Sequence, residues 1–380
     1  MCVRAKTGWI VLGLLLAFAP VGRADEFEDH VAAIKAVQRE AGGNEAAGRA
    51  VKALSGQSVS SLTKLLVAFD EASPLAANYL RGAVEAIVDR QLEAKKELPT
   101  KDLEAFVLDR NRDPRARRLA YETLLRVDQV AEARLIPGML LDPSSEFRRD
   151  AVRRLIEEAK GLGEDKKEPA IALYQKALTG ATEEDQVKDI AGALKKLGLT
   201  VDLPKHFGFL TQWKIVGPFD NKEFIGFNAV YAPEKSIDLL AKLQGASGEV
   251  AWADIATKDD FGIIDIAKSI EPFKGSVMYL TTTFVSDRDR TVDLRLGTPN
   301  AWKVWVNGQP LFGRDEYHRG MAIDQYKVPA TLKAGANVVL IKLCQNEQSD
   351  DWAQRYQLQF RVCDRSGVAV HPAVQAASAK

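Results

Sequence analysis

The stretch AWKVWVNGQPLF, residues 301–312, decides the fold of the second half of this chain. Apolar residues dominate positions 302–306, an apolar pair follows at 311–312, and Asn307-Gly308 lies between them. An Asn-Gly pair between two apolar runs predicts a two-residue type I′ hairpin, because both residues tolerate left-handed backbone. The tryptophans at 302 and 305 have opposite strand parity, so we expect at least one of them to enter a core.

Strand-like spacing continues on both sides of this hairpin. The segments TVDLRLG (291–297) and QLQFRV (357–362) alternate apolar and polar residues, and 277–286 is rich in β-branched and aromatic ones. Such runs are typical of half-buried strands. We expect about eight strands between Trp213 and Val362, with no second helical run among them. The pattern predicts an antiparallel β-sandwich over residues 213–372, followed by a tail at 373–380.

The first half has helical spacing. Glycine and proline divide residues 25–200 into nine or ten expected helices, and residues 201–212 form the expected linker. Asp113-Pro114 and Asp142-Pro143 each place a capping oxygen before a proline, which predicts a helix beginning at the proline. The segments RLAYETL (118–124) and RDAVRRL (149–155) share Arg, Ala and Leu at an offset of 31 residues. This indicates a helical repeat domain, with an irregular helical bundle as the alternative.

The N-terminal 24 residues have the order of a secretory signal peptide. Arg4 and Lys6 precede an apolar run of about eleven residues, and the small residues Gly22 and Ala24 follow it. The run is too short to span the ~30 Å hydrocarbon core of a bilayer. We therefore expect cleavage after Ala24, export to the periplasm or the cell exterior, and no membrane span in the mature chain. An uncleaved membrane anchor is the alternative.

Charge and cysteine content narrow the function classes. The chain has 52 basic and 52 acidic residues, and loss of the three basic residues within 1–24 leaves 49 against 52. That balance argues against a nucleic-acid-binding protein. Only Cys344 and Cys363 remain after cleavage, and no CxxC pair is present. A disulfide between them is excluded if 338–343 and 357–362 form one hairpin, and is possible if these strands lie in different sheets.

Four segments in order carry a resemblance to a known family. WKIVGPFD (213–220), Tyr231-x-Pro-Glu234, KVWVNG (303–308) and LKAGANVVLIK (332–342) resemble the galactose-binding-like jelly-roll β-sandwich of exported bacterial proteins and of sugar-binding modules in glycoside hydrolases. Many relatives have an aromatic residue where Ala336 stands. The helical half resembles HEAT-type repeats over about residues 58–160. These resemblances imply a solenoid that contacts a protein partner, and a sandwich that contacts carbohydrate or an envelope protein.

Catalytic motifs are scarce. The chain contains no HExxH, P-loop, GxSxG or GxGxxG sequence. Asp315-Glu316, beside Tyr317 and His318, is the best candidate for paired carboxylates of the kind that hydrolyse glycosides. We expect a non-catalytic binding or scaffold protein of the cell envelope, with a glycan-active hydrolase using Asp315, Glu316 or His318 as the alternative.

The strongest binding candidate is the polar loop 346–355. Trp352 lies there with Asp350, Asp351 and Arg355, which predicts an exposed indole beside hydrogen-bonding groups, and Tyr317 is a further candidate. Four loop aspartates also offer the oxygen ligands that a structural calcium ion prefers, namely Asp287, Asp289, Asp350 and Asp351. We expect no other cofactor or metal.

Overall fold

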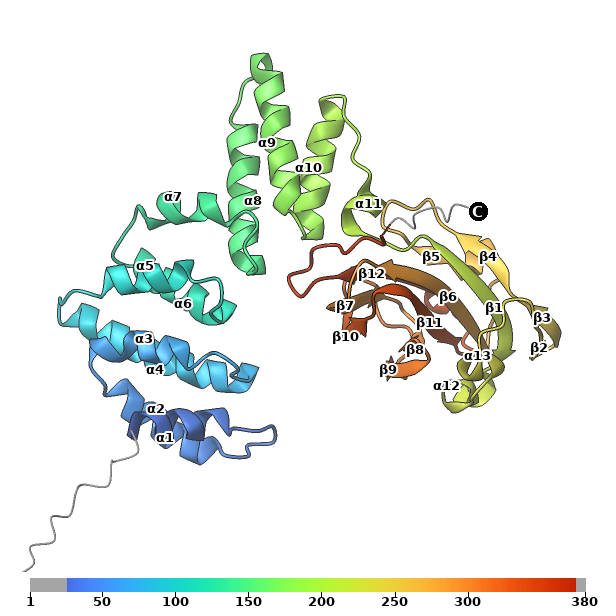
Figure 1. Cartoon of the computed structure of the whole chain (residues 1–380), viewed down its shortest axis with the longest axis horizontal. Helices are drawn as coiled ribbons and strands as arrows, with labels where there is room; N and C mark the ends of the chain where they lie inside the picture. The colour runs from blue at the N-terminus through green and yellow to red at the C-terminus, as the bar shows by residue number, and fades with distance from the viewer. Residues whose placement is uncertain (1–25, 374–380) are drawn as a thin grey trace, which may run out of the picture. The chain divides into compact units, whose positions relative to one another are not determined.

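The computed structural model describes residues 26–373, drawn in colour in Figure 1. The predicted signal peptide, its cleavage site at Ala24 and residues 374–380 lie outside these residues. The chain divides by its contacts into two compact units, one up to Leu135 and one from Ile136 on. Within 26–373, no helix is both long and apolar enough to cross a membrane.

The first unit is helical. Its helices are α1 (Glu26–Lys35), α2 (Asn44–Ser55), α3 (Leu62–Val67), α4 (Pro74–Glu93), α5 (Thr100–Leu108), α6 (Pro114–Leu125) and α7 (Ala131–Leu135). Helix α6 begins at Pro114, as predicted, because the Asp113 carboxylate accepts a hydrogen bond from the Arg115 amide at 2.8 Å. The Asp70 carboxylate in turn accepts a hydrogen bond from the Asp113 amide at 2.9 Å, which connects this cap to the turn that follows α3.

The second unit begins with four more helices, α8 (Ser145–Lys160), α9 (Lys167–Gly180), α10 (Glu184–Lys196) and α11 (Leu203–Phe207). Between Glu26 and Lys196 the described chain therefore has ten α-helices, within the predicted range. The predicted start of α8 at Pro143 is wrong, because Ser144 is its N-cap. The Asp142 carboxylate accepts from the Ser144 amide at 2.9 Å, and this turn keeps two further residues outside the helix.

The residues predicted to link two domains are packed against these helices. Phe207 and Phe209 are buried in one hydrophobic cluster with Val152, Tyr174 and Ile190. The change from helix to strand thus falls inside the second compact unit, and a domain boundary near residue 200 stays a prediction.

Two antiparallel sheets follow. The six-stranded sheet has the order β4 (Ala253–Ala256), β1 (Gln212–Asp220), β6 (Ser276–Ser286), β11 (Gly335–Gln345), β8 (Ala301–Val306), β9 (Gln309–Arg314). The four-stranded sheet has the order β10 (Tyr326–Leu332), β7 (Arg290–Gly297), β12 (Gln357–Cys363), β5 (Ile264–Asp265), and β2 (Lys242–Gly245) pairs with β3 (Gly248–Ala251) alone. The eight strands of six or more residues match the predicted number. Sequence reasoning missed the short strands β2–β5.

The six- and four-stranded sheets enclose a common core, and we call them the sheet pair. Trp302 and Leu343 enter this core from one sheet, and Leu294 and Phe360 from the other. Trp302 is fully buried there, whereas Trp305 packs on the outer face of its sheet, which confirms that one of the two tryptophans enters the core. The turn between β8 and β9 is also confirmed, with φ of 52° and 77° at its two central residues, Asn307 and Gly308.

Residues 222–235 cover part of the outer face of the six-stranded sheet. They include α12 (Ile225–Asn228) and α13 (Ala232–Lys235). The fully buried Lys342 holds this segment, because its Nζ donates to the Phe227 and Ala229 carbonyls at 3.2 and 2.7 Å and to Glu234 at 2.8 Å. The sequence predicts no second helical run in the strand region, and between Gln212 and Cys363 the α-helices are the four-residue turns α12, α13 and α14 (Ile266–Ser269).

The two cysteines are free although β11 and β12 lie in different sheets. Side chains alternate along a strand, and Leu343 and Val362 point into the shared core. Cys344 and Cys363 therefore lie on the outer faces, away from each other. Burial raises the pKa of the Cys344 thiol to about 12 and that of Cys363 to about 11.

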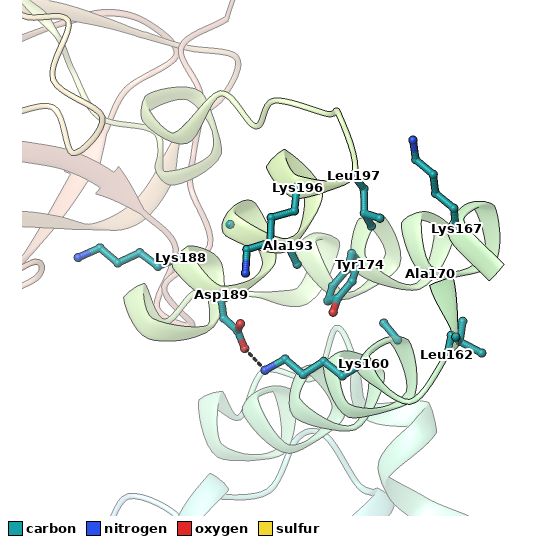
Figure 2. A pocket seen from close by; sticks show the side chains of 13 residues that line it. Lys160, Leu162, Lys167, Ala170, Tyr174, Lys188, Asp189, Ala193, Lys196 and Leu197 are labelled. Atoms are coloured by element: carbon teal, nitrogen blue, oxygen red, sulfur yellow. Dashed lines mark hydrogen bonds and ion pairs between the residues drawn. The ribbon is translucent and has the colours of Figure 1, made fainter. Parts of the chain in front are cut away.

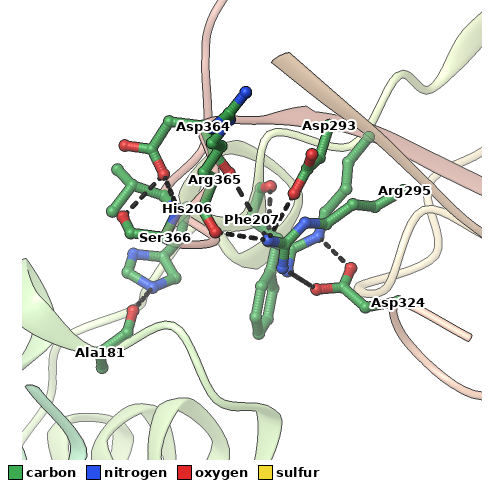
Figure 3. A network of polar contacts seen from close by, with 11 residues as sticks. Ala181, His206, Phe207, Asp293, Arg295, Asp324, Asp364, Arg365 and Ser366 are labelled. Carbon is green, nitrogen blue, oxygen red and sulfur yellow. Dashed lines mark hydrogen bonds and ion pairs between the residues drawn. The ribbon is translucent and has the colours of Figure 1, made fainter. Parts of the chain in front are cut away.

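A polar network joins the four-stranded sheet to the preceding helices (Figure 3). Asp324 accepts a hydrogen bond from Arg295 at 2.6 Å, and Asp293 accepts from the same guanidinium at 3.2 Å. His206 donates from Nε2 to the Ala181 carbonyl at 2.9 Å. Arg361 of β12 joins the two groups, because its Nη1 donates to the carbonyl of Phe207 in α11 at 3.2 Å while its Nε and Nη2 bind Asp324.

Candidate functional site

Three loops meet at one end of the sheet pair, after β1, β9 and β11. Asn221, which follows β1 and is fully buried, connects them. Its amide nitrogen donates to the Gln345 carbonyl at 2.9 Å and to the Tyr317 hydroxyl at 3.2 Å. A buried amide with partners on two other loops fixes the spacing of all three.

Four rings from these loops form a continuous series that we call the aromatic row: Phe224, Tyr317, His318 and Trp352. The ring centroids of Phe224 and Tyr317 are 5.2 Å apart, those of Tyr317 and His318 6.3 Å, and those of His318 and Trp352 5.1 Å. The two terminal rings are open to solvent, with 53% of Phe224 and 61% of Trp352 exposed. Burial of Tyr317 between them raises the pKa of its hydroxyl group. The row therefore presents uncharged aromatic surface at both ends.

Strained backbone holds two of these rings in place. Glu223, Phe224 and His318 adopt φ of 53°, 64° and 54°, a left-handed conformation that is costly for residues other than glycine. The Glu347 carboxylate accepts from the Glu223 amide at 3.0 Å, and His318 Nε2 bonds to the Asn346 side-chain oxygen at 2.7 Å. Such strain costs about 1–3 kcal/mol per residue and is concentrated at functional sites.

The predicted binding residues are placed as follows. Trp352 lies in a short 3₁₀ turn and is exposed, and Tyr317 is connected to it through His318. Asp350, Asp351 and Arg355 are exposed in the same loop as Trp352. The structure thus brings Tyr317 and Trp352 into one row across 35 residues of sequence, while their roles as ligand contacts stay predictions.

Sequence reasoning missed Phe224 and Asn221. Both belong to the segment after β1, which carries no strand or helix periodicity and no glycine at its left-handed positions. The one local signal was the polar pair Asp220-Asn221, which directly follows the largely apolar segment 213–219.

Of the three residues proposed for a hydrolase, Asp315, Glu316 and His318, the last two have partners within the protein. Glu316 forms an ion pair with Arg319 at 3.4 Å, and His318 bonds to Asn346. Partial loss of hydration raises the pKa of the Asp315 carboxyl group, opposed by the charge of Lys303. A hydrolytic role for Asp315, Glu316 or His318 stays a prediction.

Three of the four calcium candidates have partners within the protein, and one of these is Asp350, which accepts from the Gln348 side chain at 3.1 Å. Asp287 pairs with Arg290, and Asp289 accepts from the Ala334 amide at 2.8 Å and from Lys333 at 3.1 Å. Across residues 26–373, no three His, Cys, Asp or Glu side chains are grouped so that they could hold a metal ion.

Comparisons with known proteins place the chain in no family. No family model matches it, and no curated protein does. Two solved structures of the β-glucosidase from Kluyveromyces marxianus are similar to this chain, each at 12% identity. The selenomethionine-labelled enzyme has a TM-score of 0.25, and the complex with glucose has a TM-score of 0.27. Each match covers 74% of this chain and 35% of that enzyme, so the chain spans about a third of the enzyme's length.

A GH31 α-xylosidase from Xanthomonas citri is also similar, at 15% identity and a TM-score of 0.15, over 25% of this chain and 12% of that one. TM-scores this low carry no argument about the fold or activity of this chain.

Proposed function

We propose that this chain is an exported, non-catalytic binding protein of the cell envelope whose sheet pair binds carbohydrate at the aromatic row. In this proposal the sheet pair is a galactose-binding-like jelly roll, and the helices of the first half are HEAT-like repeats that contact a protein partner. The observation that supports it most is the 61% exposed Trp352 ring at the end of a row of four aromatic side chains.

The chemistry of the row suits a sugar. The C–H faces of a pyranose stack on aromatic rings, and hydroxyl groups around the ring need polar partners. Asp350, Asp351 and Arg355 surround Trp352 in the same loop and offer both acceptors and donors. The buried Gln345 side-chain amide holds this loop by donating to the Ala353 and Arg355 carbonyls at 3.0 and 3.1 Å, so little conformational freedom is lost on binding.

We favour binding over hydrolysis because two of the three nearby titratable side chains already interact with other residues of the protein. Glu316 and His318 already have protein partners, which leaves Asp315, with its raised pKa, as the remaining candidate acid. A glycan-active hydrolase is therefore the second candidate function. Release of reducing ends from a bound oligosaccharide separates the two: a hydrolase loses this release in Asp315→Asn or Glu316→Gln, whereas a lectin-like protein shows none before or after either change.

The test is calorimetric titration of the mature chain, residues 25–380, with oligosaccharides selected on a glycan array. We expect Trp352→Ala to weaken binding about tenfold, since stacking and buried area together are worth about 1.4 kcal/mol or more. Phe312→Ala is the matched control, because Phe312 is a 46% exposed aromatic on β9 outside the row. Absence of any bound glycan, or equal losses in both variants, would refute the proposal.

A further inference from the structure

Helices α8, α9 and α10 line an open cavity of about 500 Å³ on the protein surface (Figure 2). This volume lies in the range of small-molecule sites, about 300–1,000 Å³. The space exists because small side chains stand where the helices face each other: Ala159, Ala170, Gly192 and Ala193. Leu162 and Leu197 complete an apolar wall.

Most charged residues that line the cavity are positively charged. Lys160, Lys167, Lys188 and Lys196 line the cavity against a single acid, Asp189, a surplus of three positive charges (4 − 1). Asp189 is already paired with Lys160, at 2.7 Å. Lys188 pairs with Glu184 on its own helix and lies 4.5 Å from the centroid of the Phe261 ring. In Figure 2 it points away from the cavity.

The polar groups gather at one end. In Figure 2 the Lys160 and Lys196 amino groups lie at the end toward which the Tyr174 hydroxyl group points, and Lys167 stands at the other end. The Tyr174 ring is 5% exposed and is packed among the apolar residues of the helices. Two ammonium groups and a phenol therefore offer donors at the mouth of an otherwise apolar space.

We propose that this cavity binds an amphiphilic organic monoanion, a carboxylate or sulfonate joined to an apolar body. The anionic group lies among Lys160, Lys196 and Tyr174, where the ion pair of Lys160 with Asp189 leaves the charge of Lys196 as the net attraction. The apolar body lies against the small residues of α9 and α10. This site is separate from the aromatic row and does not depend on carbohydrate binding.

The probe is anilinonaphthalene sulfonate, an apolar monoanion whose fluorescence reports binding, titrated into the chain of residues 25–380. We expect one saturable site that octanoate displaces, and that octanol and octyltrimethylammonium displace at least tenfold less well. Lys196→Glu should weaken binding at least tenfold. Lys195→Glu is its control, because it makes the same charge change at an exposed position of α10 that does not line the cavity.

Gly192→Leu provides a test that does not alter charge. A Cβ atom at Gly192 meets nothing within 4 Å, so a larger side chain can begin there without a backbone clash, occupy space in the cavity and favour the helix. We expect this variant to lose probe binding while its thermal midpoint is kept or raised. Probe binding unchanged by both Gly192→Leu and Lys196→Glu, equal displacement by the cation, or no saturable binding at all would overturn the proposal.

Discussion

Arg361 binds Asp324 through two parallel hydrogen bonds, with Nε and Nη2 at 2.7 and 2.6 Å from the two carboxylate oxygens. Arg295 donates to the same carboxylate, and all three side chains are buried or nearly so. Burial alone would raise the pKa of Asp324, but the hydrogen bonds and charges of the two arginines outweigh it and lower the pKa.

We expect Asp324→Asn to lower the free energy of unfolding by about 3–5 kcal/mol, because it leaves the buried Arg361 without its counter-charge and Arg295 with Asp293 alone. Urea denaturation measures the loss. Asp254→Asn is the control: Asp254 pairs with Lys214 at 2.7 Å in a solvent-exposed position, where such pairs contribute about 1 kcal/mol or less. Similar losses in the two variants would show that the Asp324 network is not a buried ion pair in solution.

His206 should make stability depend on pH. Burial lowers the pKa of this imidazole below its value in the unfolded chain, and the nearby Arg361 and His371 add to the effect, while the bond to Ala181 opposes it. Its contribution is therefore complete above the unfolded pKa of about 6.5 and is lost as the pH falls through the folded pKa. Thermal midpoints should fall between pH 7 and pH 5, and His206→Gln should flatten that slope. An unchanged slope would contradict this.

Replacing Trp302 or Trp352 with alanine should have opposite effects on stability: a large loss at the first position and almost none at the second. Trp302 is fully buried between the sheets, so Trp302→Ala should cost about 3–5 kcal/mol of stability. Trp352 is 61% exposed and meets the His318 ring edge-on, so Trp352→Ala should leave the thermal midpoint within about 1–2 °C. Calorimetric melts of both variants check this. A large drop for Trp352→Ala would assign that ring to packing rather than to ligand binding.

Fragments can locate the domain boundary. Phe207 and Phe209 share a core with α8–α10, so a fragment of residues 205–372 exposes them, whereas residues 136–380 keep that cluster intact. We expect the longer fragment to melt cooperatively and at a higher temperature than the shorter one. Equal midpoints would place the boundary near residue 200, where the change in apolar spacing predicts it.

Features that depend on neighbouring residues could be predicted from the sequence, whereas features that depend on contacts between distant segments could not. The β8–β9 hairpin depends on neighbouring residues, Asn307 and Gly308, and could be predicted from them. Strand alternation likewise indicated that Trp302 or Trp305 enters a core. The partners of β11 and β12 could not be predicted, because a strand's own pattern does not specify which sheet it joins.

The aromatic row had the same limit. An exposed Trp352 could be predicted from the polar residues around it. Its connection to Phe224 could not, because the link passes through Asn221 and Tyr317, which are 96 residues apart in sequence, and through left-handed backbone at residues that carry no signal for it.

Cys344 and Cys363 can serve as internal reporters of local opening. Cys344 lies under the segment clamped by Lys342, and Cys363 forms a backbone bridge with Ala369 near the C-terminal end of the described chain. A buried thiol with a raised pKa reacts with alkylating reagents when its cover opens. Mass-spectrometric footprinting of the native protein would therefore time the opening of each face separately, without any engineered label.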